Sequence, residues 1–264
     1  MSTEIAIKRL VDKRKFFLHT ALAYPMFKIL KVPLQSFSRN ELREELRSRI
    51  NGKSFCHLAT VNPEFLVEAE KNINFRKLLN KTQLNICDGM GIKILSKLLY
   101  KKNITRITGV EVAEIICCLA AKEEQSVFFL GGIDVAEHAA QIMKKKYPGL
   151  KIAGTLNGNI ETFEEVKKAH PDIILVAFGS PKQEFWIEEN AHKISSLRLG
   201  VGVGGTFDFW TGKAKRAPKW MQIIGLEWLY RLIKEPFKRG PRIARAVIIF
   251  PWLALKEKYK ILKK

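Results

Sequence analysis

Short runs of apolar and β-branched residues alternate along this chain with longer segments in which apolar positions recur at helical spacing. Runs such as 173–178 carry no charge and do not alternate between polar and apolar positions, which is typical of parallel strands covered on both faces. We predict strands at Ser54–Val61, Leu84–Cys87, Ser126–Leu130, Lys151–Leu156, Asp172–Phe178 and Leu197–Val203. We predict helices at about residues 40–50, 63–80, 90–101, 109–122, 134–146, 161–169, 181–194 and 219–234.

Strands that alternate with helices indicate right-handed βαβ crossovers. The predicted fold is therefore α/β, with an open, mostly parallel Rossmann-like sheet flanked by helices. The alternation stops after residue 213, where a helical appendage is expected. We divide the chain into an N-terminal extension (1–31), an α/β domain (32–212) and a C-terminal appendage (213–264).

Positive charge is concentrated at the two ends of the chain. The formal net charge is +20, and residues 213–264 hold 15 Lys or Arg against 3 Asp or Glu. Residues 1–31 hold 7 against 2, which leaves the middle of the chain almost neutral. Cationic ends indicate an anionic partner, which is either an anionic membrane surface or a nucleic acid.

The apolar content of the appendage favours the membrane. Residues 243–255 contain one Arg and one Pro among otherwise apolar residues. This segment is too short to span a bilayer, which needs about 20 apolar residues, but its basic flanks suit a helix lying in the membrane plane. The alternative is a helix that packs on its own domain and leaves a solvated basic face.

Polar residues stand where the predicted strands end and helices begin. Thr60 and Asn62 close the first strand, Asp88 ends the second, Arg106 precedes helix 109–122, and Gln183 follows the fifth strand. In a parallel sheet these positions lie along one edge, the edge at which α/β proteins bind ligands.

Each of these positions also has a local explanation. Asn62 before Pro63 suits a helix N-cap, and Asp88 could cap the helix that follows it. Thr108 to Glu111 and Ser180 to Gln183 both match the capping-box pattern.

The run Gly200 to Gly205 carries many glycines, but its context differs from a dinucleotide-binding loop. It comes late in the chain, and no helix start is expected after it, whereas that fingerprint needs a strand, glycines and then a helix. We expect Gly204 and Gly205 to let the backbone approach a ligand closely. In an alternating segment, Asp208 would face away from Phe207 and Phe209.

Neither a metal nor a cofactor is indicated by the sequence. No Asp-x-Asp pair occurs, and the histidines are scattered. The four cysteines have no zinc-like spacing and lie in apolar segments, as is typical of reduced thiols in a cytosolic protein.

Taken together, the motifs resemble those of the WecG/TagA/CpsF family of bacterial glycosyltransferases, in order from about Val32 to Arg242. The resemblance is carried by Ala59–Phe65, Asp88–Gly91, Arg106–Gly109, Phe129–Gly132, Gly179–Glu184, Gly204–Phe209, Arg216–Pro218 and Gly225–Arg231. It implies inverting, metal-independent transfer of a hexose-type sugar (ManNAc, glucose or related) from a UDP-sugar to a polyprenyl-diphosphate-linked sugar. Such products feed wall teichoic acid, enterobacterial common antigen or exopolysaccharide synthesis.

The resemblance also implies roles for single residues. The family's catalytic base corresponds to Asp88, and its pocket residues correspond to Thr60, Asn62, Arg106 and Gln183. Its C-terminal arginines, which are thought to meet the diphosphate, correspond to Arg231, followed here by Arg239 and Arg242. The expected location is the cytoplasmic face of the bacterial inner membrane, as a peripheral protein, and a homo-oligomer is compatible with this. The alternatives left open are a basic nucleic-acid-binding protein and a non-catalytic sugar-nucleotide-binding protein.

Overall fold

The computed structural model describes residues 26–158 and 163–262, with the backbone alone for residues 231, 238, 239, 261 and 262. Most of the predicted N-terminal extension, residues 1–25, therefore lies outside the described residues.

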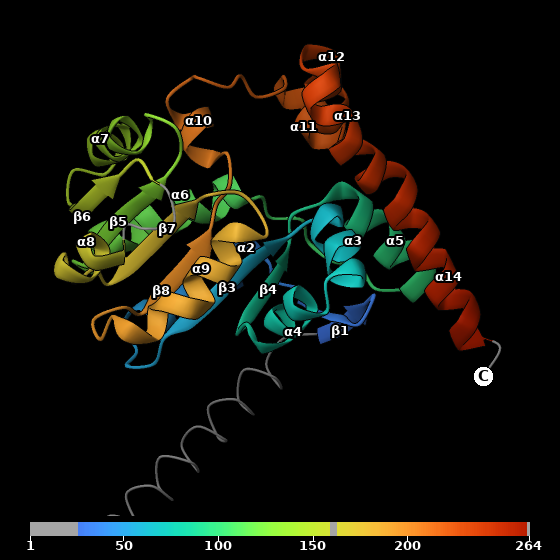
Figure 1. The fold of residues 1–264 in the computed structure, drawn as a ribbon, viewed down its shortest axis with the longest axis horizontal. Coiled ribbons are helices and arrows are strands. Elements are labelled where there is room, and N and C mark those ends of the chain that lie inside the picture. The colour runs from blue at the N-terminus through green and yellow to red at the C-terminus, as the bar shows by residue number, and fades with distance from the viewer. Residues whose placement is uncertain (1–25, 159–162, 263–264) are drawn as a thin grey trace, which may run out of the picture.

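The core of the molecule is an eight-stranded sheet with the strand order β1-β2-β4-β3-β8-β7-β5-β6 (Figure 1). The strands are β1 Met26–Ile29, β2 Val32–Gln35, β3 Cys56–Val61, β4 Leu84–Cys87, β5 Ser126–Gly131, β6 Lys151–Leu156, β7 Ile173–Ala177 and β8 Leu199–Gly202. Every neighbouring pair is parallel except β1 and β2. The predicted α/β class, the open parallel sheet and all six predicted strands are confirmed.

The hairpin β1–β2 was not predicted. Each of its strands has four residues, and β2 contains Pro33, so neither presents the uncharged apolar run that marks the other strands. Leu30 and Lys31 have left-handed backbone angles (φ 49° and 64°), as a two-residue hairpin turn requires. The sheet thus begins within the segment that the sequence assigned to the N-terminal extension.

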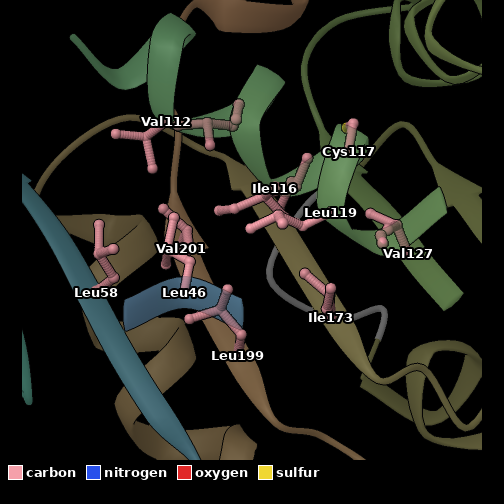
Figure 2. Close-up of a cluster of buried hydrophobic side chains, with 14 of the residues drawn as sticks. Leu46, Leu58, Val112, Ile116, Cys117, Leu119, Val127, Ile173, Leu199 and Val201 are labelled. Atoms are coloured by element: carbon pink, nitrogen blue, oxygen red, sulfur yellow. The ribbon is translucent and has the colours of Figure 1, made fainter. Parts of the chain in front are cut away.

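Helices cover both faces of the sheet, which explains the uncharged strands. On one face, α2 (Arg39–Ile50), α6 (Gly109–Lys122) and α7 (Ala136–Lys146) bury the largest apolar cluster against every second strand residue. Figure 2 shows this cluster, in which Val112 and Ile116 of α6 lie over strand residues such as Val201. The opposite face packs against α3 (Pro63–Lys71), α4 (Ile73–Lys81), α8 (Phe163–Lys168) and α9 (Lys182–Asn190).

The single helix predicted at residues 63–80 is two helices, α3 (Pro63–Lys71) and α4 (Ile73–Lys81). Asn72 separates them because its backbone is extended and its side chain accepts hydrogen bonds from the N–H groups of Asn74 and Phe75. Asn72 therefore ends one helix and caps the next.

The chain after β8 is helical throughout its regular segments. It forms α10 (Thr206–Trp210), α11 (Lys219–Ile224), α12 (Glu227–Lys234), α13 (Pro236–Ala244), a π-helical segment η2 (Arg245–Ile249) and α14 (Phe250–Leu262). The helix predicted at 219–234 breaks at Gly225, whose φ of 83° a side-chain-bearing residue rarely adopts. Residue 225 also packs so closely on Met90 that a Cβ atom would overlap that side chain.

The end of the appendage is packed on the α/β domain. Phe250 and Ala254 of α14 are fully buried in the cluster formed with α3 and with α5 (Met90–Tyr100), and α14 runs beside both helices in Figure 1. The Tyr100 hydroxyl bonds the Glu257 carboxylate. Segment 243–255 thus packs in part on its own domain, which is the alternative to a helix lying in the membrane plane. No helix within the described residues is both long and apolar enough to cross a bilayer.

Candidate functional site

A cavity of about 180 Å³ lies at the carboxyl ends of the adjacent strands β4, β3, β8 and β7. Its lining includes eight of the predicted site residues: Thr60, Asn62, Asp88, Arg106, Gln183, Gly204, Gly205 and Arg242. The structure therefore brings together, at one edge of the sheet, residues that are widely separated in the sequence. Arg231 and Arg239 lie in α12 and α13, but their side chains are outside the described residues.

Asp88 stands directly after β4 and points its carboxylate at the start of α6. Its backbone N–H donates to the Val61 carbonyl at 2.8 Å, which ties the end of β4 to β3. Its Oδ2 accepts a hydrogen bond from the N–H of Gly109, the first residue of α6, at 3.0 Å. The positive end of a helix stabilises a negative charge at this position.

The prediction that Asp88 caps the helix following it is wrong. The N-cap of α5 is Gly89, a residue without a side chain, and not Asp88. The capping box predicted for Thr108 and Glu111 is confirmed, so α6 already has its cap when Asp88 reaches it. Asp88 is therefore not the N-cap of its own helix, and its carboxylate accepts from the first residue of α6.

The two predicted polar residues of β3 line the same cavity. Thr60 is buried, and its hydroxyl donates to the Gly202 carbonyl at 3.4 Å. Asn62 is the confirmed N-cap of α3, with Oδ1 accepting from the N–H groups of Glu64 and Phe65. With its oxygen engaged in the cap, the amide nitrogen is the group that Asn62 can offer a ligand.

Gln183 joins two loops at the edge of the cavity. Its Oε1 accepts hydrogen bonds from the N–H groups of Gly179 and Gly204, both at 3.1 Å, and its Nε2 donates to Glu184 Oε1 at 2.6 Å. The capping box predicted for Ser180 and Gln183 is wrong, because α9 has no side-chain cap and Gln183 lies inside the helix.

The glycines of the run 200–205 have different surroundings: Gly204 and Gly205 line the cavity, whereas Gly202 faces α9. A Cβ atom at Gly202 would overlap the side chains of Gln183 and Glu184, so β8 admits α9 only because this position is glycine. A helix does follow the run, contrary to expectation, but α10 has only five residues. Phe207 is therefore helical and packs on Phe129, while Phe209 reaches the cavity.

Arginines supply the positive charge of the cavity. Arg106 comes from the loop before α6, Arg216 from the segment before α11 and Arg242 from α13. Nη2 of Arg106 and of Arg216 each lie 3.7 Å from Oε2 of Glu227. The Nε atoms of Arg106 and Arg216 are buried and have no hydrogen-bond acceptor among the described residues.

Arg216, Glu227 and Phe209 were not predicted as site residues. All three lie in motifs that carried the family resemblance, Gly204–Phe209, Arg216–Pro218 and Gly225–Arg231, and this was the signal available in the sequence. The position of Arg216 and Glu227 over the cavity depends on how the appendage folds back, which residue spacing does not reveal.

The thiol of Cys87 lies next to Asp88 in the sequence. Burial raises the pKa of the Cys87 thiol to about 12, and its S–H donates to the Gly89 carbonyl. Cys87 therefore stays protonated beside Asp88 and does not act as a nucleophile.

Among residues 26–158 and 163–262, no three His, Cys, Asp or Glu side chains cluster so as to hold a metal ion.

Comparison with known proteins identifies the family. The profile described as "Glycosyl transferase WecG/TagA/CpsF family" matches residues 27–264. A protein of Bacillus subtilis (strain 168), named N-acetylglucosaminyldiphosphoundecaprenol N-acetyl-beta-D-mannosaminyltransferase, is 33% identical over 194 residues, covering 72% of this chain and 75% of its own length. A protein of the same name from Bacillus spizizenii (strain ATCC 23059 / NRRL B-14472 / W23) is 33% identical over 184 residues, covering 68% and 71%. The chain belongs to the WecG/TagA/CpsF family and is a glycosyltransferase.

Proposed function

We propose that this glycosyltransferase moves a hexose-type sugar (ManNAc, glucose or related) from a UDP-sugar to a polyprenyl-diphosphate-linked sugar, with inversion and without a metal ion. The observation that carries the proposal is the Asp88 carboxylate, which lies in one cavity with Thr60, Asn62, Gln183 and arginine side chains. The names of the two Bacillus proteins support a lipid-diphosphate-linked acceptor and a ManNAc-type sugar.

In this proposal Asp88 is the general base. Its carboxylate takes the proton from the acceptor hydroxyl as that oxygen attacks the anomeric carbon of the donor. The new carbon–oxygen bond forms on the face opposite the departing UDP, so an α-linked donor yields a β-linked product. The bond to UDP breaks with its electron pair, and the negative charge develops on the diphosphate.

Arginines and the start of α6 would stabilise that charge. Arg106 and Arg216 present buried Nε–H donors without acceptors, and charge-assisted bonds from guanidinium groups to phosphate are strong. The first turn of the fourteen-residue helix α6 adds its positive end to the same cavity. Arg231, Arg239 and Arg242 of the appendage would meet the diphosphate of the lipid acceptor.

The appendage, residues 213–264, would also hold the enzyme at the cytoplasmic face of the membrane. Large apolar side chains are exposed along it: Trp220, Ile223, Ile224, Ile233, Phe237, Val247, Ile248, Trp252, Leu255 and Tyr259. Phe237 is 96% exposed, and basic residues are interspersed with these side chains. Apolar groups beside cationic ones suit the interface of an anionic bilayer.

Product analysis with a panel of donors tests the proposal. Purified protein is incubated with individual UDP-sugars and a short-chain polyprenyl diphosphate carrying N-acetylglucosamine, with and without a chelator. We expect mass spectrometry to show one added hexose-type sugar for one donor, NMR to show a β linkage, and the rate to survive chelation. Retained configuration would contradict the single displacement, and a rate abolished by chelation and restored by a divalent cation would contradict metal independence.

A further inference from the structure

Glu184 is a fully buried acidic residue that the proposed mechanism does not use. It lies in the first turn of α9, has 0% of its surface exposed and does not line the cavity. Burial raises its pKa to about 7, although hydrogen bonds from Gln183, its own backbone and Ser180 oppose this. Burying an acidic group costs stability unless its contacts compensate, so we ask which contacts Glu184 makes.

The contacts of Glu184 determine which way the Gln183 amide faces. Two backbone N–H groups, from Gly179 and Gly204, converge on one end of that amide, which must therefore be its oxygen. The other end is the nitrogen, and it donates to Glu184 Oε1 at 2.6 Å. An amide nitrogen carries two hydrogens, so one N–H of Gln183 is left after Glu184 has accepted the first.

The surrounding backbone packs closely against both side chains of the pair. Gly202 faces both side chains with no room for a Cβ atom, and Gln183 is only 3% exposed. Gly179 and Gly204, which Gln183 binds, belong to the loops after β7 and β8 and themselves line the cavity.

We propose that Glu184 is a positioning residue for sugar transfer: by accepting one N–H of Gln183, it fixes the two cavity loops to that amide and directs the remaining N–H toward an oxygen of the sugar donor. Glu184 acts through Gln183 and touches no substrate. The part of this inference that concerns the donor rests on the proposed function.

A positioning role and a space-filling role predict different effects of an apolar replacement. Glu184→Leu keeps most of the side-chain volume but removes the acceptor, which leaves one N–H of Gln183 without its partner. If Glu184 positions Gln183, this variant should loosen the two loops. If Glu184 only fills space, the loops should keep their protection and the melting temperature should change little.

The experiment compares Glu184→Leu with Glu184→Gln, which retains an acceptor oxygen of the same reach, and with Asn190→Ala as a control. Asn190 is a third buried polar residue of α9, and its amide nitrogen donates to the Trp186 carbonyl. Amide hydrogen exchange at Gly179 and Gly204, melting temperature, and kcat and KM for the UDP-sugar are measured for each full-length variant. Glu184→Ala is measured in the same way, so that the comparison does not depend on whether leucine is accommodated.

We expect Glu184→Leu and Glu184→Ala to speed exchange at both glycines about tenfold and to raise KM for the donor about tenfold, which is the order of one lost hydrogen bond. Glu184→Gln should stay within about threefold of the natural protein in both quantities. Asn190→Ala should lower the melting temperature without changing KM.

Natural exchange rates at both glycines in the Leu and Ala variants would overturn the proposal. So would a Gln variant that behaves like the Leu variant, because acceptor geometry would then not be what matters. If the natural protein turns over no UDP-sugar, the proposed function fails, but the exchange rates still decide whether Glu184 positions the loops.

Discussion

Oε2 of Glu227, the first residue of α12, lies 3.7 Å from Nη2 of Arg106, in the loop before α6. Both side chains are largely buried, and the same carboxylate oxygen lies 3.7 Å from Arg216. One carboxylate of the appendage thus stands between two guanidinium groups of the cavity. The loop before α6 and the appendage are joined by charge at the point where we expect the diphosphate to bind.

Glu227→Ala should loosen the appendage and weaken substrate binding. The substitution leaves two partly buried positive charges facing each other without the carboxylate, which is more damaging than losing an exposed ion pair. We expect kcat/KM to fall about tenfold or more and hydrogen exchange in α11 and α12 to rise. Glu124→Ala, which removes the exposed pair with Lys151, is the control and should change neither quantity. Equal, small effects in both variants would show that Glu227 contributes no more to the cavity than an exposed ion pair does.

Asp88→Asn should remove turnover and leave the fold and donor binding intact. Asparagine keeps an oxygen that can accept from the Gly109 N–H, but it cannot take a proton from the acceptor hydroxyl. Loss of a general base corresponds to a drop of about 10²–10⁴ in turnover. Steady-state rates, calorimetric titration with the donor and the melting temperature separate the three properties. Turnover near that of the natural protein would end the assignment of Asp88 as the base.

The sheet and the edge that carries the site could be predicted because both depend on local patterns. Uncharged strands such as Ile173–Ala177 indicate burial on both faces of the sheet. The polar residues that follow such strands lie at one edge because the strands are parallel. The hairpin β1–β2 could not be predicted, because β2 has only four residues and contains Pro33. It joins the sheet by pairing with β4, which is a contact between distant segments of the chain.

The parts of the site that could not be predicted arise from long-range packing. Arg216 and Glu227 reach the cavity only because α11 and α12 fold back over the sheet edge, and their spacing along the chain gives no sign of this. Glu184 looks like an ordinary polar helix residue in sequence. Its burial follows from the close approach of α9 to Gly202, a contact between two segments.

Gly202→Ala should disturb the cavity more than a matched substitution on the same strand. The added methyl group would overlap the side chains of Gln183 and Glu184, whereas at Gly200 it would meet Ile187 and Phe55, away from the cavity. We expect both variants to lower the melting temperature, because overpacking strains the core. Only Gly202→Ala should weaken donor binding, by about tenfold or more in calorimetric titration. Equal donor affinities in the two variants would contradict the role given to the pair behind Gly202.

Acid should destabilise this protein through His57. Its ring is buried, and that burial lowers its pKa to about 3. Below about pH 6.5 the unfolded chain binds a proton at this residue and the folded chain does not, so the free energy of unfolding falls as pH falls toward 3. The slope approaches about 1.4 kcal/mol per pH unit, which gives a loss of about 2 kcal/mol between pH 7 and pH 5.

Urea unfolding at pH 7, 6 and 5 measures this loss. His57→Leu, which keeps an apolar group in the same space, should lose about 2 kcal/mol less than the natural protein, because other titrating groups such as Glu184 cancel in the comparison. His138→Leu, at an exposed position, should follow the natural protein. Parallel pH dependence in all three proteins would show that His57 takes up its proton without unfolding.

Substitutions on the exposed face of the appendage should release the protein from anionic vesicles. Truncation after residue 213 is a poor test, because it removes Phe250 and Ala254 from the core cluster as well as the exposed side chains. Ile223→Ser combined with Phe237→Ser leaves that core intact and removes two apolar groups that are 76% and 96% exposed. Each such group contributes about 1.5–3 kcal/mol when buried, so vesicle affinity should fall at least tenfold.

Ile133→Ser provides the matched control for this measurement. Ile133 is also 76% exposed, but it follows β5 on the α/β domain, outside the appendage. Cosedimentation with vesicles containing phosphatidylglycerol should show natural binding for this control, and binding by the natural protein should weaken as salt screens the basic residues. If the control loses as much affinity as the double variant, the membrane surface is not confined to the appendage. If neither loses any, apolar insertion by the appendage is excluded, and charge alone holds the protein to the vesicle.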